Sequence, residues 1–516
     1  MAQSITGTSL AVNAVKAVRQ PSVEFNVAWG RTADTFPDNW ATQSTNEYAR
    51  IRSVNWTRQL DMKGPLAQGS SPVAALTVEL DNYDNRYSPF NSSGALYASL
   101  LASTTTAGGL TVQYPKIWQV PVQLKTGFEN ERVTSFTGLI DEPDEAYGVN
   151  GSTVSYRCFD VGGMLLKRKF STALRSQINT GDWITYLAQV GGVTALDIDH
   201  GFFYLPYAWL DDEDVYSEAT KAAASEGGYF FFSETGTGTF RNAAWWAMRT
   251  DSKVSVYTFT VAKFTDISPG YDWKSLATGA RVEYQGRQPA GEQTVWKSSG
   301  VLVVPPGFSS IEARLEYPCE EIYPPSSPID WLPINAGGVP MLGEIGVNLL
   351  DKAAQRATIW FSNLSHETAF ITRMQLRGRA LYGGPTEQVN RSVDVALVPT
   401  NVVRISDNPY IQTKPQAELV ADLSVDRMQY PRMTYRINGA PAIPWLQLGD
   451  RVTITAAEPI TTSREAILTK LDYSWQPNGR FSMNVEAVDA AGLFQYAKFF
   501  VLGTSAYGDA DEVLFR

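Results

Sequence analysis

The sequence contains little cysteine and little histidine. Its 516 residues include two cysteines, Cys158 and Cys319, and two histidines, His200 and His366. The cysteines lie far apart, which excludes a disulfide-stapled fold and favours synthesis in a reducing compartment, although a single bridge stays open. A four-ligand zinc centre would need all four of these residues, at spacings that match no zinc motif. We therefore expect no metal site.

Net positive charge and long apolar segments are also absent. Lys and Arg number 43 against 53 Asp and Glu, so the formal net charge is −10, unlike that of a polyanion-binding protein. No segment approaches the run of about 20 apolar residues that spans a bilayer, and residues 1–20 lack the basic start and apolar core of a secretion signal. We expect a chain that is neither exported by that route nor embedded in a membrane.

Several enzyme motifs are missing as well. There is no Gly-x-Ser-x-Gly nucleophile elbow and no phosphate-binding loop, and His366-Glu367 lacks the second His of a zinc protease. The turn at 236–238 has too few glycines for a dinucleotide-binding loop and precedes a strand, so it indicates a hairpin. No residue qualifies as catalytic, cofactor-binding or metal-binding, and we expect a protein that is not an enzyme and has no cofactor.

What the sequence does contain is apolar and aromatic material for several cores. Hydrophobic residues make up 44% of the chain and aromatic residues 12%, and the length suggests about three or four domains. Segments that mix β-branched and aromatic residues with alternation predict strands. These segments are 22–29, 48–58, 73–80, 117–125, 132–140, 153–159, 357–361, 369–381, 451–456, 466–475 and 481–488.

Helical periodicity is confined to a few places. Residues 180–190 have apolar residues at helical spacing and end at Gly191-Gly192, and a second helix follows the acidic run 211–214. The hairpin 229–241 comes next. Thr413 and Gln416 have the spacing of a capping box, which predicts a helix that begins there.

Two further segments have unusual compositions. Residues 91–109 are rich in Ser, Thr, Ala and Gly, too long for a hairpin turn and apolar in the middle, so we expect a projecting arm with a short helix that contacts a neighbouring ring. Prolines gather between residues 285 and 345, which favours loops and edge strands over regular sheet.

The two β-rich ends of the chain show a weak internal repeat. Residues 154–165 align without gaps on 483–494, so Asp160 matches Asp489, and the preceding strand aligns 137–139 on 469–471. Each copy has a strand, a turn, a strand, an Asp that would cap the exit turn, and an apolar pair. Chance similarity between two hairpins is the alternative. If the repeat is real, the chain contains two related barrels.

Acidic clusters are the main candidates for chemistry. Asp141, Glu142, Asp144 and Glu145 could supply the acid and base of a glycosidase, but a solvated turn around Pro143 is the favoured interpretation, because acidic turns are common. The run 211–214 could ligate a metal, yet negative charge is favoured at a helix start. Asp197, Asp199 and Gly201 imitate part of a calcium loop, without the Glu ligand at its twelfth position.

Basic residues also follow a pattern. Arg373, Gln375, Arg377 and Arg379 alternate with apolar residues along one predicted strand. A phosphate-binding surface is one interpretation; a solvated face or ion pairs with acidic neighbours is the other, and the net charge favours it. Residues 167–169 have the same two interpretations. His200 is expected in a loop and His366 in a turn, neither with a partner that would make it a base.

One motif resembles a known family. The segment reads Ala75-Leu-Thr-Val-Glu-Leu-Asp81-Asn-Tyr-Asp84-Asn-Arg86-Tyr-Ser-Pro89 and resembles a pattern of central tail hub proteins of long-tailed bacteriophages. Other segments agree, in the family's order: Phe136-Thr-Gly-Leu-Ile-Asp141, Arg157-Cys-Phe-Asp160, Tyr229-Phe-Phe-Phe-Ser-Glu-Thr-Gly236, Leu376-Arg-Gly378 and Leu448-Gly-Asp-Arg-Val452. The resemblance covers 72–165, 205–245 and 370–500, and is poor over 251–350.

The resemblance implies a mainly β protein with a small α/β insertion, in which two tail-tube-like β-barrel modules and two further domains form a trimeric ring. The implied boundaries are an N-terminal arm and first strand (1–45), the first tube-like module (46–169), the α/β domain (170–250), a Pro-rich β domain (251–400), the second tube-like module (401–500) and a C-terminal tail (501–516). No lysozyme, peptidase or long fibre extension is expected.

The function implied is a non-enzymatic hub of the virion tail tip, assembled in the cytoplasm of the bacterial host. It would adapt hexameric tail rings to a threefold tip around a mostly acidic or neutral DNA channel. The implied partners are two further copies, a hexameric distal tail or tail tube protein, the tape measure protein, tip or fibre proteins, and DNA in transit. The alternatives are a host-receptor or glycan-binding tail protein, suggested by Trp245-Trp246, and a carboxylate-dependent glycoside hydrolase using Asp141 and Glu142.

Overall fold

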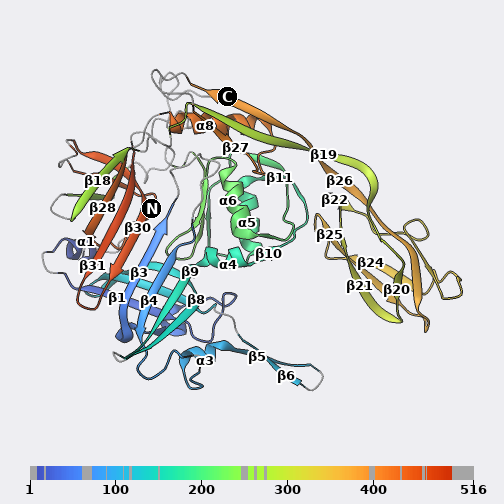
Figure 1. Ribbon diagram of the computed structural model, residues 1–516, viewed down its shortest axis with the longest axis horizontal. Coiled ribbons are helices and arrows are strands. Elements are labelled where there is room, and N and C mark those ends of the chain that lie inside the picture. Colours follow the sequence, from blue (N-terminus) through green and yellow to red (C-terminus); the bar gives the residue numbers. More distant parts are fainter. Residues whose placement is uncertain are drawn as a thin grey trace.

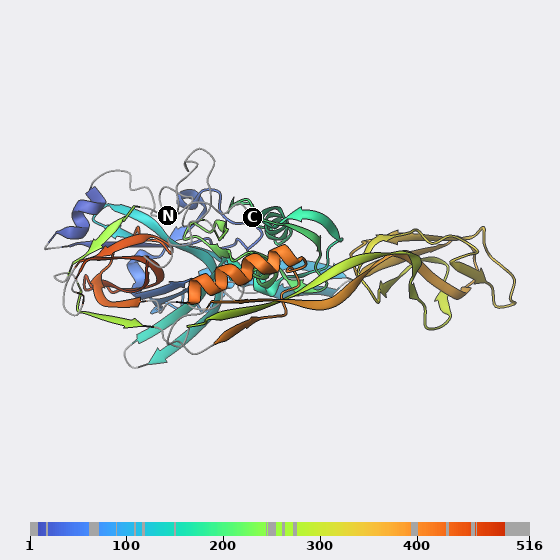
Figure 2. The ribbon, with the colours of Figure 1, turned by 90° about the horizontal axis from the view of Figure 1, so that it is seen from above.

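The computed structural model describes residues 9–16, 19–60, 72–88, 90–107, 110–115, 119–148, 151–243, 245, 254–260, 264–271, 276–393, 401–429, 433–455, 460 and 462–490. Figure 1 shows a large sheet, a group of helices beside it, and a long two-stranded ribbon that carries a small β domain at its far end. The same ribbon extends away from the body in the second view (Figure 2). The expected mainly β fold with a small α/β part is confirmed.

The large sheet has 13 strands and is built from two units with the same strand order. Unit 1 has the order β3, β4, β9, β8, β7, β1, and unit 2 has the order β18, β28, β31, β30, β29, β17. The strands of the two units also follow each other along the chain in the same way. In each unit the first strand in sequence takes the last position of the order, and the last strand in sequence takes the third position. Neighbouring strands are antiparallel in both units except for the last pair of unit 2, in which β17 and β29 are parallel.

The strands of unit 1 are β1 (Pro21–Val27), β3 (Ile51–Gln59), β4 (Ala75–Asp81), β7 (Pro121–Phe128), β8 (Glu131–Gly148) and β9 (Gly151–Asp160). The strands of unit 2 are β17 (Tyr257–Phe259), β18 (Asp266–Tyr271), β28 (Met433–Pro441), β29 (Arg451–Ile454), β30 (Arg464–Trp475) and β31 (Phe481–Asp489). The short β2 (Thr45–Asn46) pairs with β1, and α1 (Ser9–Val15), α2 (Trp40–Gln43) and the 3-10 turn η1 (Tyr48–Arg50) lie in the N-terminal part of the chain.

A β-bulge at the same place in each unit supports duplication. In unit 1, Ile140 pairs with Cys158 and Glu142 pairs with Arg157, so one extra residue lies between them on β8. In unit 2, Leu468 pairs with Ala487 and Lys470 pairs with Glu486, with one extra residue on β30. Because a bulge kinks its strand and strengthens the local twist, a shared bulge gives both units the same bend.

The bulge also corrects the sequence alignment of the repeat. Cys158 and Ala487, which the predicted alignment places together, occupy the same position in the two ladders. The first strand is different, because the bulge equates Ile140 with Leu468. The predicted match of 137–139 with 469–471 is therefore out of register. Short apolar strands align with themselves at several offsets, and only hydrogen-bond register distinguishes these.

The two units form one continuous structure. Residues 54–59 of β3 pair with residues 470–475 of β30, so the edge of unit 1 continues into unit 2. Across this joint the rings of Trp56 and Tyr473 stack with centroids 4.7 Å apart. Buried side chains from both units belong to a single hydrophobic cluster. The relative orientation of the units is therefore fixed by backbone hydrogen bonds and by a shared core.

The helices α4 (Val161–Lys167), α5 (Thr180–Val190) and α6 (Val215–Ala224) form a second core between the two units in sequence. Asp160 caps α4 by accepting a hydrogen bond from the Gly162 amide at 2.9 Å, as predicted for the exit turn. The predicted helix at 180–190 ends at Gly191, and the alanine face of α6 is fully buried. The short strands of this region are β10 (Lys169–Phe170), β11 (Arg175–Asn179), β12 (Leu196–Ile198), β13 (Tyr204–Ala208), β14 (Glu213–Asp214), β15 (Tyr229–Phe232) and β16 (Gly238–Arg241).

The Pro-rich segment contains far more regular sheet than expected. Strand β19 (Gly279–Lys297) pairs along almost its whole length with β26 (Ala369–Ser392), with Pro289 opposite Leu381. The prediction of loops was wrong here. Beyond its contact with β27 (Val402–Ile405), β19 has a partner on one side only, and proline is tolerated on such an edge.

The far end of the ribbon carries what we call the distal domain, residues 295–380, which has its own core. Its strands are β20 (Leu302–Val304), β21 (Gly307–Arg314), β22 (Cys319–Ile322), β23 (Trp331–Ile334), β24 (Ile345–Leu350) and β25 (Arg356–Asn363), together with the ends of β19 and β26. The two cysteine thiols are both free: Cys319 is buried in this core and Cys158 in the core of the large sheet.

Helix α8 (Lys414–Met428) lies along the base of the ribbon (Figure 2). Ala417, Ala421 and Ser424 are buried, as predicted, against a core that includes Val282 and Val389 of the ribbon. The capping box is not formed, because Thr413 makes no capping side-chain bond. Gln416 instead accepts from the Gln412 amide at 3.1 Å and donates to Ser225 Oγ at 3.2 Å, which attaches α8 to the end of α6.

The predicted arm contains the expected short helix. Helix α3 (Ala95–Leu100) is followed by the hairpin of β5 (Leu101–Ala107) and β6 (Leu110–Pro115), which extends away from the large sheet (Figure 1). No helix in the described ranges is both long enough and apolar enough to span a bilayer.

Candidate functional site

The loop that carries the family motif is a fixed structure at the end of β4. We call residues 81–88 the motif loop. Asp81 Oδ1 accepts from the Tyr83 amide at 3.2 Å, and Asp84 Oδ1 accepts from the Arg86 amide at 3.2 Å. Asn85 has a φ of 56°, a left-handed conformation that Asn tolerates. The predicted Asx-rich turn is confirmed, except at Pro89, which lies outside the described residues.

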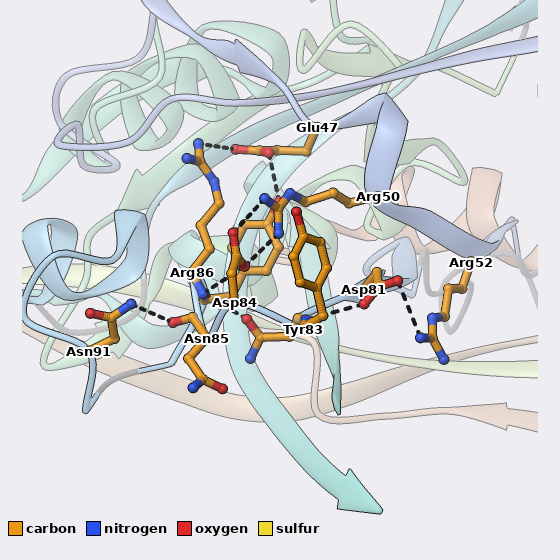
Figure 3. A network of polar contacts seen from close by, with 11 residues as sticks. Glu47, Arg50, Arg52, Asp81, Tyr83, Asp84, Asn85, Arg86 and Asn91 are labelled. Carbon is orange, nitrogen blue, oxygen red and sulfur yellow. Dashed lines mark hydrogen bonds and ion pairs between the residues drawn. The ribbon is translucent and has the colours of Figure 1, made fainter. Parts of the chain in front are cut away.

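A buried carboxylate holds this loop against the sheet. Glu47 lies just before η1, and its side chain is 5% exposed. It accepts hydrogen bonds from Tyr87 Oη at 2.6 Å and Trp29 Nε1 at 2.9 Å. It also accepts one from an Arg86 guanidinium nitrogen at 3.0 Å (Figure 3). Burial, together with the hydrogen bond to Glu47, raises the pKa of Tyr87 above its usual range.

A second, outer layer of charge pairs covers the loop. Both guanidinium nitrogens of Arg50 donate to Asp84 at 2.7 Å, and Arg52 pairs with Asp81 at 3.3 Å (Figure 3). The hydrogen bond from Arg50 lowers the pKa of Asp84 to about 2. The Arg50 guanidinium also lies over the Tyr83 ring at 5.1 Å. With these contacts made, Tyr83 stays 72% exposed and Phe90 90% exposed, so the loop presents two aromatic rings to solvent.

The acidic residues 141–145 lie in a strand, which corrects the predicted turn. Strand β8 continues to Gly148, and Glu142, Pro143 and Asp144 pair with β9. Pro143 is accommodated because β7 pairs with β8 only as far as Leu139, which leaves one edge free. Asp141 is the extra residue of the bulge and forms an ion pair with Lys167.

The other acidic clusters have structural partners. Asp214 caps α6 by accepting from the Ser217 amide at 2.7 Å, as the helix-start interpretation predicts. Asp197 and Asp199 both form ion pairs with Arg241, whose side chain is 3% exposed. Within the part of the chain that the structure describes, no group of three acidic, His or Cys side chains could hold a metal ion.

Two arginines of the basic stripe on β26 pair with acidic residues of the same chain, whereas Arg373 donates to the Pro328 carbonyl. Arg377 donates to Asp330 at 2.8 Å and also pairs with Glu292, and Arg379 pairs with Glu320 at 3.3 Å. Burial alone would raise the pKa of Asp330. Hydrogen bonds from Arg377, Ser326 and Gln375 outweigh burial and lower this pKa to about 2. The stripe therefore fits the ion-pair interpretation, as does Arg168, which pairs with Asp34 at 2.5 Å.

The remaining sequence candidates are structural. Trp245 is 3% exposed and lies in the core of the large sheet, which corrects its reading as a surface aromatic, and Trp246 lies outside the described residues. His200 lies in an exposed loop next to Asn179, at 3.3 Å between nitrogens, and His366 in an exposed bend.

Sequence reasoning missed several buried polar groups, of which two join distant parts of the chain. One is Glu47, and the other is the pair of Arg58 and Glu234, whose side chains are 5% and 6% exposed and 2.9 Å apart. The family motif contains Glu234 and Arg86, but their partners lie far away in sequence. A charged residue inside an otherwise alternating strand, such as Arg58 in β3, was the available signal.

Glu226 gives a testable pH dependence. Its side chain is fully buried, Oε2 accepts from the Phe202 amide at 2.9 Å, and burial raises the pKa of Glu226 to about 8. The folded state thus binds a proton more tightly than the unfolded state, so this contribution to stability is complete below pH 4 and is lost as the pH rises through 8. Raising the pH from 6 to 7 should cost up to about 1.4 kcal/mol through this group.

We expect Glu226→Gln to remove the contribution of this group to the change in unfolding free energy between pH 6 and pH 7. Urea denaturation at both pH values, followed by far-UV circular dichroism, measures that change. Asp160, whose pKa burial raises to about 7, contributes in both proteins and serves as the internal control. Equal changes in the two proteins would contradict the assignment.

Comparisons with known proteins found similarity to solved structures. No protein-family model matches the sequence, and no curated protein matches it. Three solved structures resemble the chain: the 43 kDa tail protein of prophage MuSo2 from Shewanella oneidensis (TM-score 0.46, 9% identity, 91% of this chain and 99% of that one); a tail protein from Neisseria meningitidis MC58 (0.47, 9%, 92% and 98%); and prophage tail protein gp18 from Listeria monocytogenes EGD-e (0.42, 8%, 90% and 94%).

Proposed function

We propose that the chain is a non-enzymatic structural hub of a phage tail tip, where it adapts hexameric tail rings to a threefold tip and surrounds the DNA channel. The observation that carries the proposal is the duplication of a six-strand unit with one strand order and one bulge position. Three copies of a chain with two such units offer six similar surfaces, which is what a sixfold neighbour requires.

The connection between the units supports this role. A ladder between β3 and β30 and a shared core fix the angle between them within one chain. A ring of three chains then needs only the contact between copies to complete a six-unit ring. The insertions after β9 and β18, which form the helical core and the ribbon, lie outside the units and leave their strand order unchanged.

Electrostatics are consistent with a channel that DNA passes through. Each chain has a net charge of −10, and Arg377 and Arg379 of the candidate stripe are already ion-paired. Such a surface does not hold the phosphate backbone, so we propose a mostly acidic or neutral lumen. The proposed partners are the hexameric distal tail or tail tube protein, the tape measure protein and tip or fibre proteins, with the arm of α3, β5 and β6 contacting a neighbouring ring.

The copy number tests the proposal. We expect mass measurement of purified tail tips, or symmetry-resolved cryo-electron microscopy, to give three copies of the chain for each hexameric ring next to it. The neighbouring hexameric protein, counted in the same particles, is the internal standard. One copy or six copies per ring would refute the threefold adaptor.

A further inference from the structure

Among the residues that the structure describes, no other sheet or helix packs on the outer face of the three-stranded sheet in the distal domain. In β25 the inward residues Ala357, Ile359 and Phe361 are buried in the domain core, whereas Thr358, Trp360 and Ser362 alternate with them and face outward. The strand order β21, β25, β24 puts Trp360, on the central strand, at the centre of this outer face. We call this surface the distal face.

An aromatic stack stands on the distal face. Phe308 of β21 and Trp360 of the neighbouring β25 are diagonal neighbours, with ring centroids 4.9 Å apart and planes 7° from parallel. The side chain of Phe308 is 67% exposed, so one face of the stack is open to water. Exposing a large aromatic surface is costly, and the domain core does not account for it.

Small uncharged polar side chains surround Trp360. Ser310 pairs with it across β21, Asn348 pairs with it across β24, and Ser362 and Thr358 flank it along β25. None of these four side chains forms a hydrogen bond with another described residue. A Cβ at Gly346 would overlap Ser362 Oγ, so the glycine leaves space for the Ser362 side chain on this face.

The charges on the distal face are already paired. Glu312 and Arg356 form an ion pair at 3.1 Å, and Arg314 pairs with Asp211 at 3.6 Å. The centre of the face therefore offers an aromatic surface and neutral hydrogen-bonding groups, and is complementary to an uncharged ligand. A pyranose ring has both parts of the matching chemistry: C–H groups that contact the electron-rich face of an aromatic ring, and hydroxyls that bond to Ser, Thr and Asn.

We propose that the distal face is a binding site for a neutral saccharide, with the pyranose ring on the open side of the Phe308 and Trp360 stack. The proposal is independent of the hub function, since it rests on the distal domain alone.

The test is isothermal titration of the full-length chain with chitohexaose, maltohexaose and cellohexaose. We expect at least one of these neutral hexasaccharides to bind in the micromolar to low millimolar range, and Trp360→Ala and Phe308→Ala each to weaken binding tenfold or more. The matched control is Leu364→Ala, which removes a side chain that is 78% exposed in the same domain but lies beyond the end of β25. It should bind within twofold of the unchanged protein.

Phe308 is mostly exposed, so its variant keeps the test valid if Trp360→Ala unfolds the domain. No binding of any of the three saccharides up to about 5 mM would overturn the proposal. So would binding that both aromatic variants retain, or binding only to a charged polymer with strong dependence on salt. Capture of a protein partner by this face without saccharide binding would also overturn it.

Discussion

Replacing Glu234 by alanine is expected to lower the free energy of unfolding by about 3–5 kcal/mol, because it leaves a buried guanidinium without its partner. Glu234 lies in the turn between β15 and β16, and Arg58 lies in β3 of unit 1, 176 residues away in sequence. The guanidinium donates to Glu234 at 2.9 Å and to the Phe232 carbonyl at 3.1 Å. Gln447, just before β29 of unit 2, donates to the other carboxylate oxygen at 2.5 Å.

Glu234 thus joins three parts of the chain. Its loss removes an acceptor from unit 1 and from unit 2 at once, so the two units and the helical core should separate at lower urea. The measurement is the urea midpoint and slope, followed by tryptophan fluorescence and by circular dichroism. We expect the unfolding curves from the two probes to differ in the variant.

The matched control is Glu129→Ala, which breaks the ion pair between Lys16 and Glu129, whose side chains are 46% and 44% exposed. An exposed pair contributes about 0–1 kcal/mol, so this variant should stay close to the unchanged protein. A second control, Arg58→Met with Glu234→Met, removes both charges and should recover much of the loss. If Glu234→Ala costs no more than Glu129→Ala, the joint does not hold the units together.

Local signals in the sequence predict the elements whose stability is local. Asp214 before an alanine-rich face and Gly191 after a periodic stretch place α6 and α5 correctly, because capping and helical spacing involve neighbouring residues. The motif loop is predicted for the same reason, since its Asx turns are bonds between residues two apart.

Features that depend on distant strands are not predicted. The local sequence predicts a turn at Pro143 and loops or edge strands around Pro289. Both prolines lie in long paired strands, on edges that tolerate proline. Gln416 has the spacing of a capping box, yet its amide bonds to Ser225, 191 residues away. The partners of Glu47 and Glu234 could not be found for the same reason, because only the folded sheet places them together.

The sequence predicts the internal repeat only in part. Alternation in β9 and β31 is strong enough to align the second strand of each hairpin. The preceding strands have only short apolar stretches before the bulge, Leu139-Ile140 in β8 and Ala466-Ile-Leu468 in β30, and stretches this short fit several registers. The structure selects one register, and that register makes the duplication clearer than the sequence does.

The second large effect is expected at the motif loop. Glu47→Ala should lower the free energy of unfolding by about 2–4 kcal/mol, because Tyr87 Oη and Trp29 Nε1 lose their acceptor and Arg86 loses its ion pair. Tyr87 is fully buried, so its hydroxyl cannot turn to water without moving the loop. We therefore expect local opening of the motif loop, in addition to lower global stability.

Amide hydrogen exchange measures both effects. In Glu47→Ala, exchange in the motif loop should rise tenfold or more, while β9 keeps its protection under native conditions. The control is Asp84→Asn, which weakens a pair whose acidic side chain is 38% exposed and should cost less than about 1 kcal/mol. Unchanged exchange in the motif loop of Glu47→Ala would show that the outer pairs of Arg50 and Arg52 alone hold it. In that case the buried carboxylate would have no role in positioning Tyr83.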